Sequence, residues 1–358
     1  MAQKIIVLGS GIIGANIAYQ LQSGGADVTI IDAGGASATQ ASFGWINASF
    51  FLDHDHFHLR ADSIAAYRDL TAALDLPVDW CGCLCFENKG DALDAQAAEL
   101  RDLGYEFTEI DAKTFAQFAP CVANPPERSL LFAQEGAAES GALANRLLKA
   151  ALAAGARIAR GVSATGFEVV AGKVVGVHTN AGTLQADQVI SAIGTGTQSL
   201  LNSVGINIPL AQRPAVMLKT QPLPPLFQHI LVTEMGEMRQ LPDGSLMMPA
   251  AISHQRDASE TLAHAIDKEA DISLARFQAL MPDVALRWDA AELAHRPVPA
   301  DNLPVVGHVM EGLYVACMHS GITLGALMGL LIGAEVLNGP TNPTTKRLAP
   351  YRPDRFRT

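Results

Sequence analysis

A short glycine-rich turn near the start of the chain constrains the fold more than any other feature. The aliphatic run Lys4–Leu8 is followed by the segment Gly9–Gly14, which reads GSGIIG and has the spacing Gly-x-Gly-x-x-Gly. An apolar helix pattern continues to Leu21, and a second aliphatic run ends at Asp32. Strand, turn, helix, strand and terminal acid in this order are typical of a Rossmann-like unit that binds an adenine dinucleotide.

Each glycine of this motif has its own predicted role. We expect Gly9 to permit the tight turn, Gly11 to let a pyrophosphate approach the backbone, and Gly14 to let helix and strand pack closely. Ile12 and Ile13 begin the helix, whose free N–H groups and positive dipole end favour the pyrophosphate.

The residues that follow suit the same ligand. Asp32 ends the second strand, where an acid accepts hydrogen bonds from the adenosine ribose. The segment 33–42 reads AGGASATQAS and contains no bulky side chain. Such a segment is typical of a loop that lets the backbone pass close to a ligand.

Composition excludes several other classes of protein. The 358 residues are enough for two lobes with substantial cores. The net charge of −11 and the lack of a long basic run argue against nucleic acid, because phosphate neutralisation needs clustered Lys and Arg. An odd count of five cysteines indicates free thiols in a reducing compartment. The first strand begins almost at once, so we expect no signal peptide and a cytoplasmic protein.

One stretch resembles a membrane span in composition. The segment 321–337 is strongly apolar, but it is short for a span and contains four glycines and Glu335. We predict a buried core helix there and no transmembrane segment.

Two clusters resemble metal sites, and neither has a complete ligand set. Three histidines alternate in 54–58, before a helix predicted over 57–74, and a solvated helix start explains them better than a metal. Three cysteines alternate in 81–85, which is not the two-residue gap of zinc knuckles. Cysteines in a buried strand behave as small hydrophobic residues, so we predict no metal site.

The middle of the chain is rich in strands. The segment 157–194 has the pattern of a β-meander that ends in a buried strand and a glycine, and strand-like runs dominate 209–248 with a hairpin at 243–244. Helices are predicted over 91–103, 141–154 and 262–280. We expect an α/β fold in which a mostly antiparallel sheet lies over the cofactor and is interwoven with the Rossmann-like lobe.

The C-terminal block supplies a second helix N-terminus. A strand over 312–317 leads through His319, Ser320 and Gly321 into the apolar helix, so backbone N–H groups there can bind an anion or a carbonyl. In a flavoprotein such groups face the pyrimidine ring and stabilise the negative charge of reduced flavin. A histidine that only caps the helix is the alternative for His319.

Three separated blocks, taken together, resemble the FAD-dependent amino-acid and amine oxidoreductases of the D-amino-acid oxidase, glycine oxidase and sarcosine oxidase family. The blocks are Gly9–Gly14 with Asp32 and 40–42, the meander that ends at Gly194, and 296–325. The resemblance implies an FAD-binding lobe formed by 1–78, 140–208 and 297–358. It implies a substrate lobe formed by 79–139 and 209–296.

The resemblance also implies the site residues. Those expected to bind FAD are Gly9, Gly11, Ile12, Ile13, Gly14, Asp32, Ala33, Gln40, Ala41, Ser42, Trp45, Ile46, Asn47, Val162, Ala192, Gly194, His319, Ser320, Gly321, Ile322, Thr323 and Leu324. Val162 falls where the family's backbone meets adenine, and 319–324 falls where it holds the flavin ring. Arg296 falls where glycine-oxidase-like members pair an arginine with a substrate carboxylate. Arg296 and His319 are therefore the candidate catalytic residues, and His254 is a further candidate for the substrate pocket.

Noncovalent FAD is implied by two departures from members with a covalent flavin. Those members have a histidine in the early loop or a cysteine shortly before the last strand, whereas 42–47 contains no histidine, 296–304 contains no cysteine, and Cys317 lies too late.

The predicted activity is oxidation of the C–N bond of an amino acid or secondary amine, by hydride transfer to flavin N5 and hydrolysis of the imine. Oxidation of a 2-hydroxy acid on the same scaffold stays open, because an arginine serves any carboxylate. A non-catalytic or accessory flavoprotein subunit also stays open. The expected electron acceptor is oxygen, a quinone or a protein. A homo-oligomer and a complex with a partner subunit are both compatible with these hypotheses.

Overall fold

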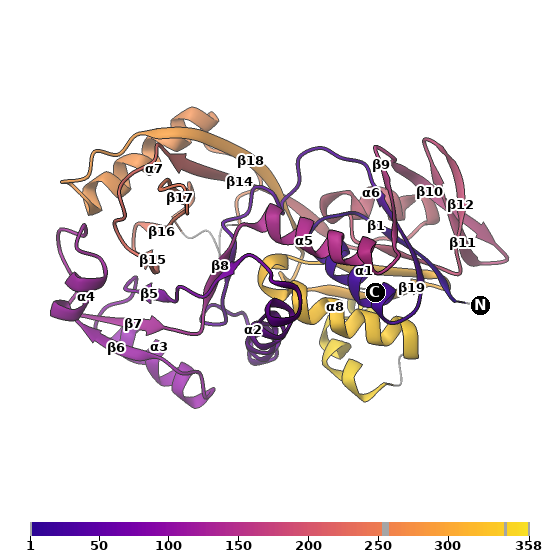
Figure 1. Ribbon diagram of the computed structural model, residues 1–358, viewed down its shortest axis with the longest axis horizontal. Coiled ribbons are helices and arrows are strands. Elements are labelled where there is room, and N and C mark those ends of the chain that lie inside the picture. Colours follow the sequence, from indigo (N-terminus) through magenta and orange to yellow (C-terminus); the bar gives the residue numbers. More distant parts are fainter. Residues whose placement is uncertain (1, 253–257, 340–341, 357–358) are drawn as a thin grey trace.

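The computed structural model describes residues 2–252, 258–339 and 342–356. It consists of two halves joined by a pair of long strands (Figure 1). The predicted α/β class, with a Rossmann-like sheet beside a mostly antiparallel one, is confirmed.

The Rossmann-like half contains a six-stranded sheet in the order β19-β20-β13-β1-β2-β9. Its parallel strands are β1 (Lys4–Leu8), β2 (Asp27–Asp32), β9 (Arg157–Arg160), β13 (Gln188–Ser191) and β20 (Leu313–Cys317), and β19 (Val305–Met310) is antiparallel to β20. The helices around it are α1 (Ile12–Ser23), α2 (His54–Leu74), α5 (Ser140–Ala153) and α8 (Gly321–Asn338). Helix α1 packs against both α5 and α8, and α2 packs against α8.

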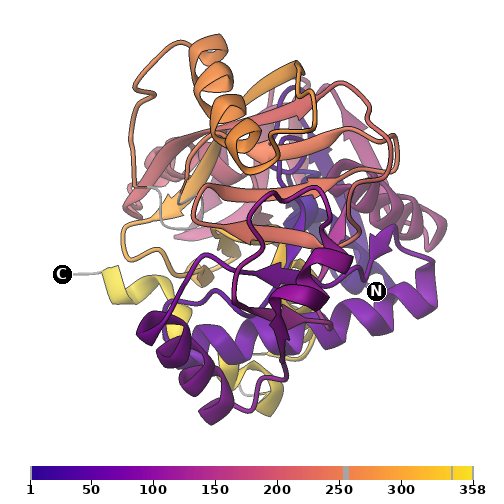
Figure 2. The same cartoon turned by 90° about the vertical axis from the view of Figure 1, so that its left-hand side faces the viewer.

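The other half is built on an eight-stranded sheet in the order β18-β14-β17-β16-β15-β5-β7-β6. Its strands are β5 (Cys83–Cys85), β6 (Thr108–Asp111), β7 (Arg128–Phe132), β14 (Leu210–Thr220), β15 (Ile230–Thr233), β16 (Gly236–Gln240), β17 (Leu246–Pro249) and β18 (Trp288–Pro299). Its pairs are antiparallel except β15 with β5. The helices of this half are α3 (Asp91–Asp102), α4 (Ala112–Phe118) and α7 (Ile266–Leu280). Figure 2 faces this half and shows α7, in orange, over the strands.

Smaller elements complete the chain. One three-stranded sheet contains β10 (Ala164–Val170), β11 (Lys173–Thr179) and β12 (Gly182–Gln185), and another contains β3 (Trp45–Ile46), β8 (Gly136–Ala138) and β4 (Val78–Asp79). The short helical segments are α6 (Thr197–Leu201), η1 (Gly194–Gly196), η2 (Asn202–Val204), η3 (Pro343–Tyr351) and η4 (Pro353–Phe356).

The predicted meander over 157–194 is wrong in its extent. Only β10, β11 and β12 form an antiparallel meander, whereas β9 and β13 at its two ends are parallel strands of the Rossmann-like sheet. A strand pattern in the sequence shows no partner, so it does not separate these two kinds of pairing. The predicted hairpin at 243–244 joins β16 to β17.

Helix α8 is apolar because it is a core helix. In the described part of the chain it alone is long and apolar enough to cross a membrane, and 72% of its residues are buried inside the protein. The carboxylate of Glu335 is buried within it and accepts hydrogen bonds from the Tyr314 hydroxyl at 2.7 Å and from Arg352 at 2.9 Å. A charge in this helix is therefore paired inside the protein, as a buried ion requires.

Among the described residues, no group of three or more His, Cys, Asp or Glu side chains is arranged to hold a metal ion. Cys83 and Cys85 are fully buried, and all five thiols are free. His54 and His58 are exposed, but His56 is buried, so the predicted solvated helix start is wrong for His56.

Candidate active site

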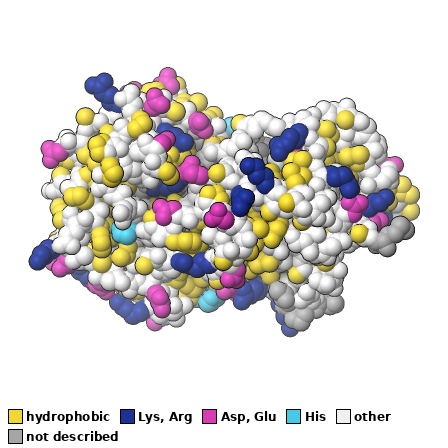
Figure 3. All heavy atoms as spheres, viewed as in Figure 1, with side chains coloured by type: hydrophobic (Ala, Val, Ile, Leu, Met, Phe, Trp, Pro, Cys, Tyr) yellow, Lys and Arg dark blue, Asp and Glu magenta, His cyan; other side chains and the backbone are white. Residues whose placement is uncertain are grey.

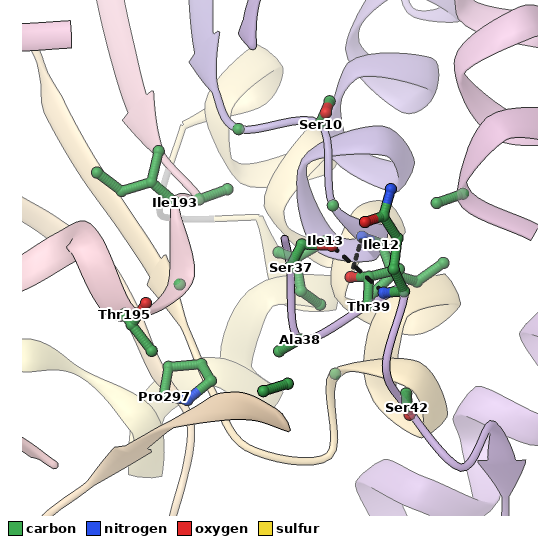
Figure 4. A pocket seen from close by; sticks show the side chains of 18 of the residues that line it. Ser10, Ile12, Ile13, Ser37, Ala38, Thr39, Ser42, Ile193, Thr195 and Pro297 are labelled. Carbon is green, nitrogen blue, oxygen red and sulfur yellow. Dashed lines mark hydrogen bonds between the residues drawn. The ribbon is translucent and has the colours of Figure 1, made fainter. Parts of the chain in front are cut away.

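A cleft of about 770 Å³ runs along the carboxyl ends of the parallel strands. Its walls come from the β1–α1 turn, the loop 31–45, the segments 160–164 and 192–196, part of β18, and the start of α8. In Figure 4 the turn at Ile12 and the loop that carries Thr39 face Ile193, Thr195 and Pro297 across this cleft. Ligands of open α/β sheets bind at this edge.

The three glycines of the turn differ in what surrounds them. Gly9 has a φ of +96°, and an added Cβ would lie 2.5 Å from the carbonyl oxygen of Ala192. At Gly14 a Cβ would lie 2.0 Å from the carbonyl oxygen of Gly9, so only glycine lets α1 begin so close to β1. A Cβ at Gly11 would meet only the hydroxyl of Thr39, at 3.1 Å, and Gly11 lines the cleft.

Two polar side chains organise the nucleotide end of the cleft. The Thr39 hydroxyl accepts a hydrogen bond from the Ile12 N–H at 3.0 Å and so joins the small-residue loop to the helix start. The Asp32 carboxylate accepts the Gly34 N–H at 3.0 Å and lies 3.5 Å from the guanidinium of Arg160. Asp32 therefore faces the cleft from the end of β2, beside a cation.

The start of α8 is held firmly at the other end. Ser320 is its N-cap, with a left-handed φ of 56°. The Ser63 and Tyr67 hydroxyls of α2 donate to the Thr323 and Ile322 carbonyls, each at 2.6 Å. The Thr323 hydroxyl donates to the Trp45 carbonyl at 3.0 Å, which joins this helix start to β3.

A buried acid fixes the loop that follows β3. Glu135 is fully buried and accepts hydrogen bonds from the Trp45 indole at 3.0 Å, the Ala48 and Ser49 N–H groups at 3.1 and 2.9 Å, and the Tyr105 hydroxyl at 2.9 Å. Burial raises the pKa of Glu135, while these donors oppose that rise.

A buried arginine fixes the same loop from the side of α2. The guanidinium of Arg60 donates to the Asn47 carbonyl at 3.1 Å and to the Asn47 side-chain oxygen. Burial lowers the pKa of Arg60 to about 10, so Arg60 stays a cation at neutral pH.

A second cavity of about 220 Å³ adjoins the cleft. Arg60, Arg296, His319 and Ser320 line both cavities. The other described residues that line the second cavity are Phe50, Phe51, Leu52, His56, Arg213, Ala258, Val298 and Asn302. It is smaller than the roughly 300–1,000 Å³ of pockets for drug-sized ligands, so it suits a small molecule.

The described part of the lining of the second cavity is basic. Three arginines line it, and no Asp or Glu is among its described lining residues. Arg296 is 8% exposed and donates to the Pro214 carbonyl at 3.3 Å. His56 accepts the Leu52 N–H at its Nδ1, and burial and the Arg60 charge lower the pKa of His56 to about 3, so His56 is neutral.

Most residues predicted from the sequence to bind FAD meet at the cleft. Those that line it are Gly9, Gly11, Ile12, Ile13, Asp32, Ala33, Gln40, Ala41, Ser42, Trp45, Val162, Ala192, Gly194, His319, Ser320, Gly321, Ile322 and Thr323. Four others, Gly14, Ile46, Asn47 and Leu324, lie behind this wall and shape it through packing or hydrogen bonds. His254 lies outside the described residues.

Sequence reasoning missed five polar residues near these cavities. The sequence pattern predicts a loop around Thr39 but no role for its hydroxyl, and it does not place Arg60, His56, Arg213 or Glu135 at the site. Thr39 was the one with a local signal, because it is a polar residue in a small-residue loop after the fingerprint. The others reach the site from separate elements.

Comparison with known proteins agrees with this geometry. A family model described as DAO, FAD dependent oxidoreductase, matches residues 4–335. The chain is 28% identical to an uncharacterized oxidoreductase of Bacillus subtilis, over 98% of each chain. It is 24% identical to a D-amino acid dehydrogenase of Rhizobium johnstonii, over 97% of this chain and 99% of that one.

A solved structure shares the fold over nearly its whole length. The glycine oxidase from Geobacillus kaustophilus superposes with a TM-score of 0.84 at 22% identity, over 98% of this chain and 99% of that one. Its likeness shows the fold, and the family model adds the cofactor. From the glycine turn, the cleft and these matches, we conclude that the chain belongs to the DAO family of FAD-dependent oxidoreductases.

Proposed function

We propose that the protein oxidises the C–N bond of an amino acid or an N-alkyl amino acid. The observation that carries the proposal is the position of Arg296, whose side chain lines both the FAD-sized cleft and the small basic cavity beside it. A guanidinium offers two parallel N–H donors to a carboxylate, which fixes the orientation of a substrate as well as its place.

The residues of the cleft fit FAD. The Gly9–Gly14 turn exposes backbone at the start of α1, as a pyrophosphate requires, and Asp32 stands at the end of β2 for the ribose. Burial raises the pKa of the Cys317 thiol, which also lines the cleft, to about 12, so it is not the thiolate that attachment to a flavin would need. This supports noncovalent binding.

Bound FAD supplies a two-electron acceptor for the hydride that leaves the α-carbon as the amine loses a proton and a C=N bond forms. Water then hydrolyses the imine to an oxo acid and an amine or ammonia. The part of the chain itself is to hold the carboxylate with Arg296, to exclude water with Phe50 and Phe51, and to present backbone N–H groups of the α8 start to the cleft. Oxygen, a quinone or a protein would serve as the final electron acceptor.

The test is anaerobic bleaching of the flavin absorbance by a panel of D- and L-amino acids, glycine, N-methyl amino acids and the matching 2-hydroxy acids. Bleaching by an amino acid but not by its hydroxy analogue supports the proposal. Bleaching only by hydroxy acids assigns the alternative 2-hydroxy-acid activity. A flavin that stays oxidised with every compound, in protein with full FAD content, contradicts both and favours an accessory flavoprotein.

A further inference from the structure

A fully buried carboxylate lies behind one wall of the cleft. Charged side chains are scattered over the face of the protein in Figure 3, where water solvates them, whereas Glu135 has no exposed surface. Glu135 lies between β7 and β8, and its carboxylate reaches the segment 45–49, which begins with β3. Because a buried charge needs hydrogen-bond donors, the groups around Glu135 show which part of the site it holds.

The four donors divide unequally between the two carboxylate oxygens. Oε1 accepts hydrogen bonds from the Ala48 and Ser49 N–H groups and from the Tyr105 hydroxyl, at 3.1, 2.9 and 2.9 Å. Oε2 accepts the indole N–H of Trp45 at 3.0 Å. The contact with Trp45 is therefore made by the second oxygen, apart from the three contacts that hold the loop and Tyr105.

The backbone of Trp45 is held without Glu135. Trp45 pairs with Ala137 in the β3–β8 ladder, and the Thr323 hydroxyl of α8 donates to the Trp45 carbonyl at 3.0 Å. The indole ring packs edge-on against Phe50, with 5.2 Å between the ring centroids. The hydrogen bond to Glu135 therefore fixes the orientation of the indole rather than the path of the chain at β3.

The indole lies where the two cavities adjoin. Trp45 lines the cleft, and Phe50, which its ring contacts, lines the small cavity. The glycine turn and Asp32 are proposed to bind the pyrophosphate and the ribose, which leaves the α8 end of the cleft for the flavin ring. The contact with Thr323 places Trp45 at that end.

We propose that Glu135 is a positioning residue for the cofactor, because it holds the indole of Trp45 against the flavin end of the cleft. The inference concerns the cofactor of the family and does not depend on which substrate is oxidised. An amide at position 135 can keep one oxygen for the three donors at Oε1, but its N–H groups would then face the indole N–H. Two donors cannot form a hydrogen bond, so Glu135→Gln should release the indole and leave the other three contacts in place.

The first experiment measures the circular dichroism of the flavin bands and the Kd of FAD in the FAD-loaded protein and its variants. Glu135→Gln is expected to change the flavin dichroism and to raise the Kd of FAD by about tenfold, the scale of one lost hydrogen bond to a charged group. An unchanged dichroism and Kd in this variant overturns the inference. Glu234→Gln, in an exposed ion pair with Lys89, is the matched control for the change from acid to amide.

A variant within the same network separates positioning from stability. Tyr105→Phe removes one donor from Oε1 and leaves the hydrogen bond to Trp45 in place. Its flavin dichroism should stay unchanged even where its free energy of unfolding is lower. If Tyr105→Phe changes the flavin dichroism as much as Glu135→Gln does, the network serves stability alone and the inference fails.

A double-mutant cycle tests whether Glu135 acts through Trp45. Trp45→Phe removes the indole N–H, so adding Glu135→Gln to this variant should change the Kd of FAD by less than about twofold. An equal effect of Glu135→Gln in the two backgrounds overturns the inference. If the variants behave as expected but no amine or amino acid bleaches the flavin, the inference stands and the proposed function fails.

An NMR measurement on the unsubstituted holoprotein keeps the inference testable if Glu135→Gln does not fold. The chain has three tryptophans, and the indole N–H signal that is absent from Trp45→Phe belongs to Trp45. This signal should exchange with deuterium more slowly than that of Trp288, whose indole donates to the exposed Asp271. Exchange as fast as that of Trp288 would show that the indole is not held, and it would overturn the inference.

Discussion

The buried histidine of α2 makes a prediction about pH that can be worked out from its contacts. His56 is 4% exposed, and its Nδ1 accepts the Leu52 N–H at 3.3 Å, which requires an unprotonated nitrogen there. Burial, and secondly the charge of Arg60, lowers the pKa of His56 from 6.5 to about 3. Below pH 6.5 the unfolded chain therefore binds a proton at this residue that the folded chain does not.

The sign and the size follow from this difference. The neutral form contributes stability that is complete above pH 6.5 and is lost as the pH falls toward 3, since protons then favour the unfolded chain. Each pH unit within that range changes the free energy of unfolding by about 1.4 kcal/mol. Between pH 7 and pH 5, protonation of the unfolded chain at His56 should lower the free energy of unfolding by about 2 kcal/mol.

The assay combines titration with unfolding. His56→Asn keeps an acceptor for the Leu52 N–H but cannot titrate, and His178→Asn removes an exposed histidine of β11 as the control. Urea unfolding of the FAD-loaded proteins at pH 7 and pH 5 should show a fall that is about 2 kcal/mol smaller in His56→Asn than in the unsubstituted protein. The reasoning is refuted if both fall equally, or if the NMR signal lost in His56→Asn titrates near pH 6.5.

Three further substitutions test the cleft and the core. Arg296→Lys should weaken the binding of an amino-acid substrate by about 2–4 kcal/mol while FAD stays bound, because a point charge replaces a bidentate partner. The measurement is kcat/KM for the amino acid and for its decarboxylated amine, and an equal loss for both would make Arg296 structural. Gly14→Ala should abolish FAD retention, measured by flavin absorbance per protein after desalting, because its Cβ would lie 2.0 Å from a backbone carbonyl oxygen; Gly166→Ala, whose Cβ has no neighbour closer than 3.8 Å, should retain FAD. Glu335→Leu should lower the free energy of unfolding in urea by about 3 kcal/mol, because it removes the carboxylate that pairs with the half-buried Arg352. Glu311→Gln, in an exposed ion pair with Lys173, should lower it by less than about 1 kcal/mol, and similar losses in both variants would contradict the role assigned to burial.

The parts of the fold that sequence reasoning found are those that local geometry dictates. Gly9 and Gly14 are required by a positive φ and by a close contact within one turn, so their spacing alone predicts that turn. Asp32 follows because a strand of known length ends there. The apolar run of α8 similarly predicts that this helix is buried.

The parts that it did not find depend on contacts between distant segments. Arg60 and His56 lie on an ordinary amphipathic helix, and nothing in the sequence separates them from its exposed polar residues. The position of Arg213 follows only from the pairing of its strand with β18, some eighty residues later. The same limit explains the misassigned meander, since the strand patterns of β9 and β13 do not show that these strands pair in parallel with β2 and β1.

The β14–β18 ribbon separates two tasks that a smaller enzyme would have to combine. Its backbone ladder runs from Leu210 opposite Pro299 to Thr220 opposite Trp288, and this ladder does not depend on which side chains face the small cavity. Exchanging the residues that alternate along this ribbon would change the lining of the small cavity without altering the glycine turn at the start of α1. Selection or design can therefore change ligand specificity at a few cross-strand positions of this ribbon while the Rossmann-like half stays unchanged.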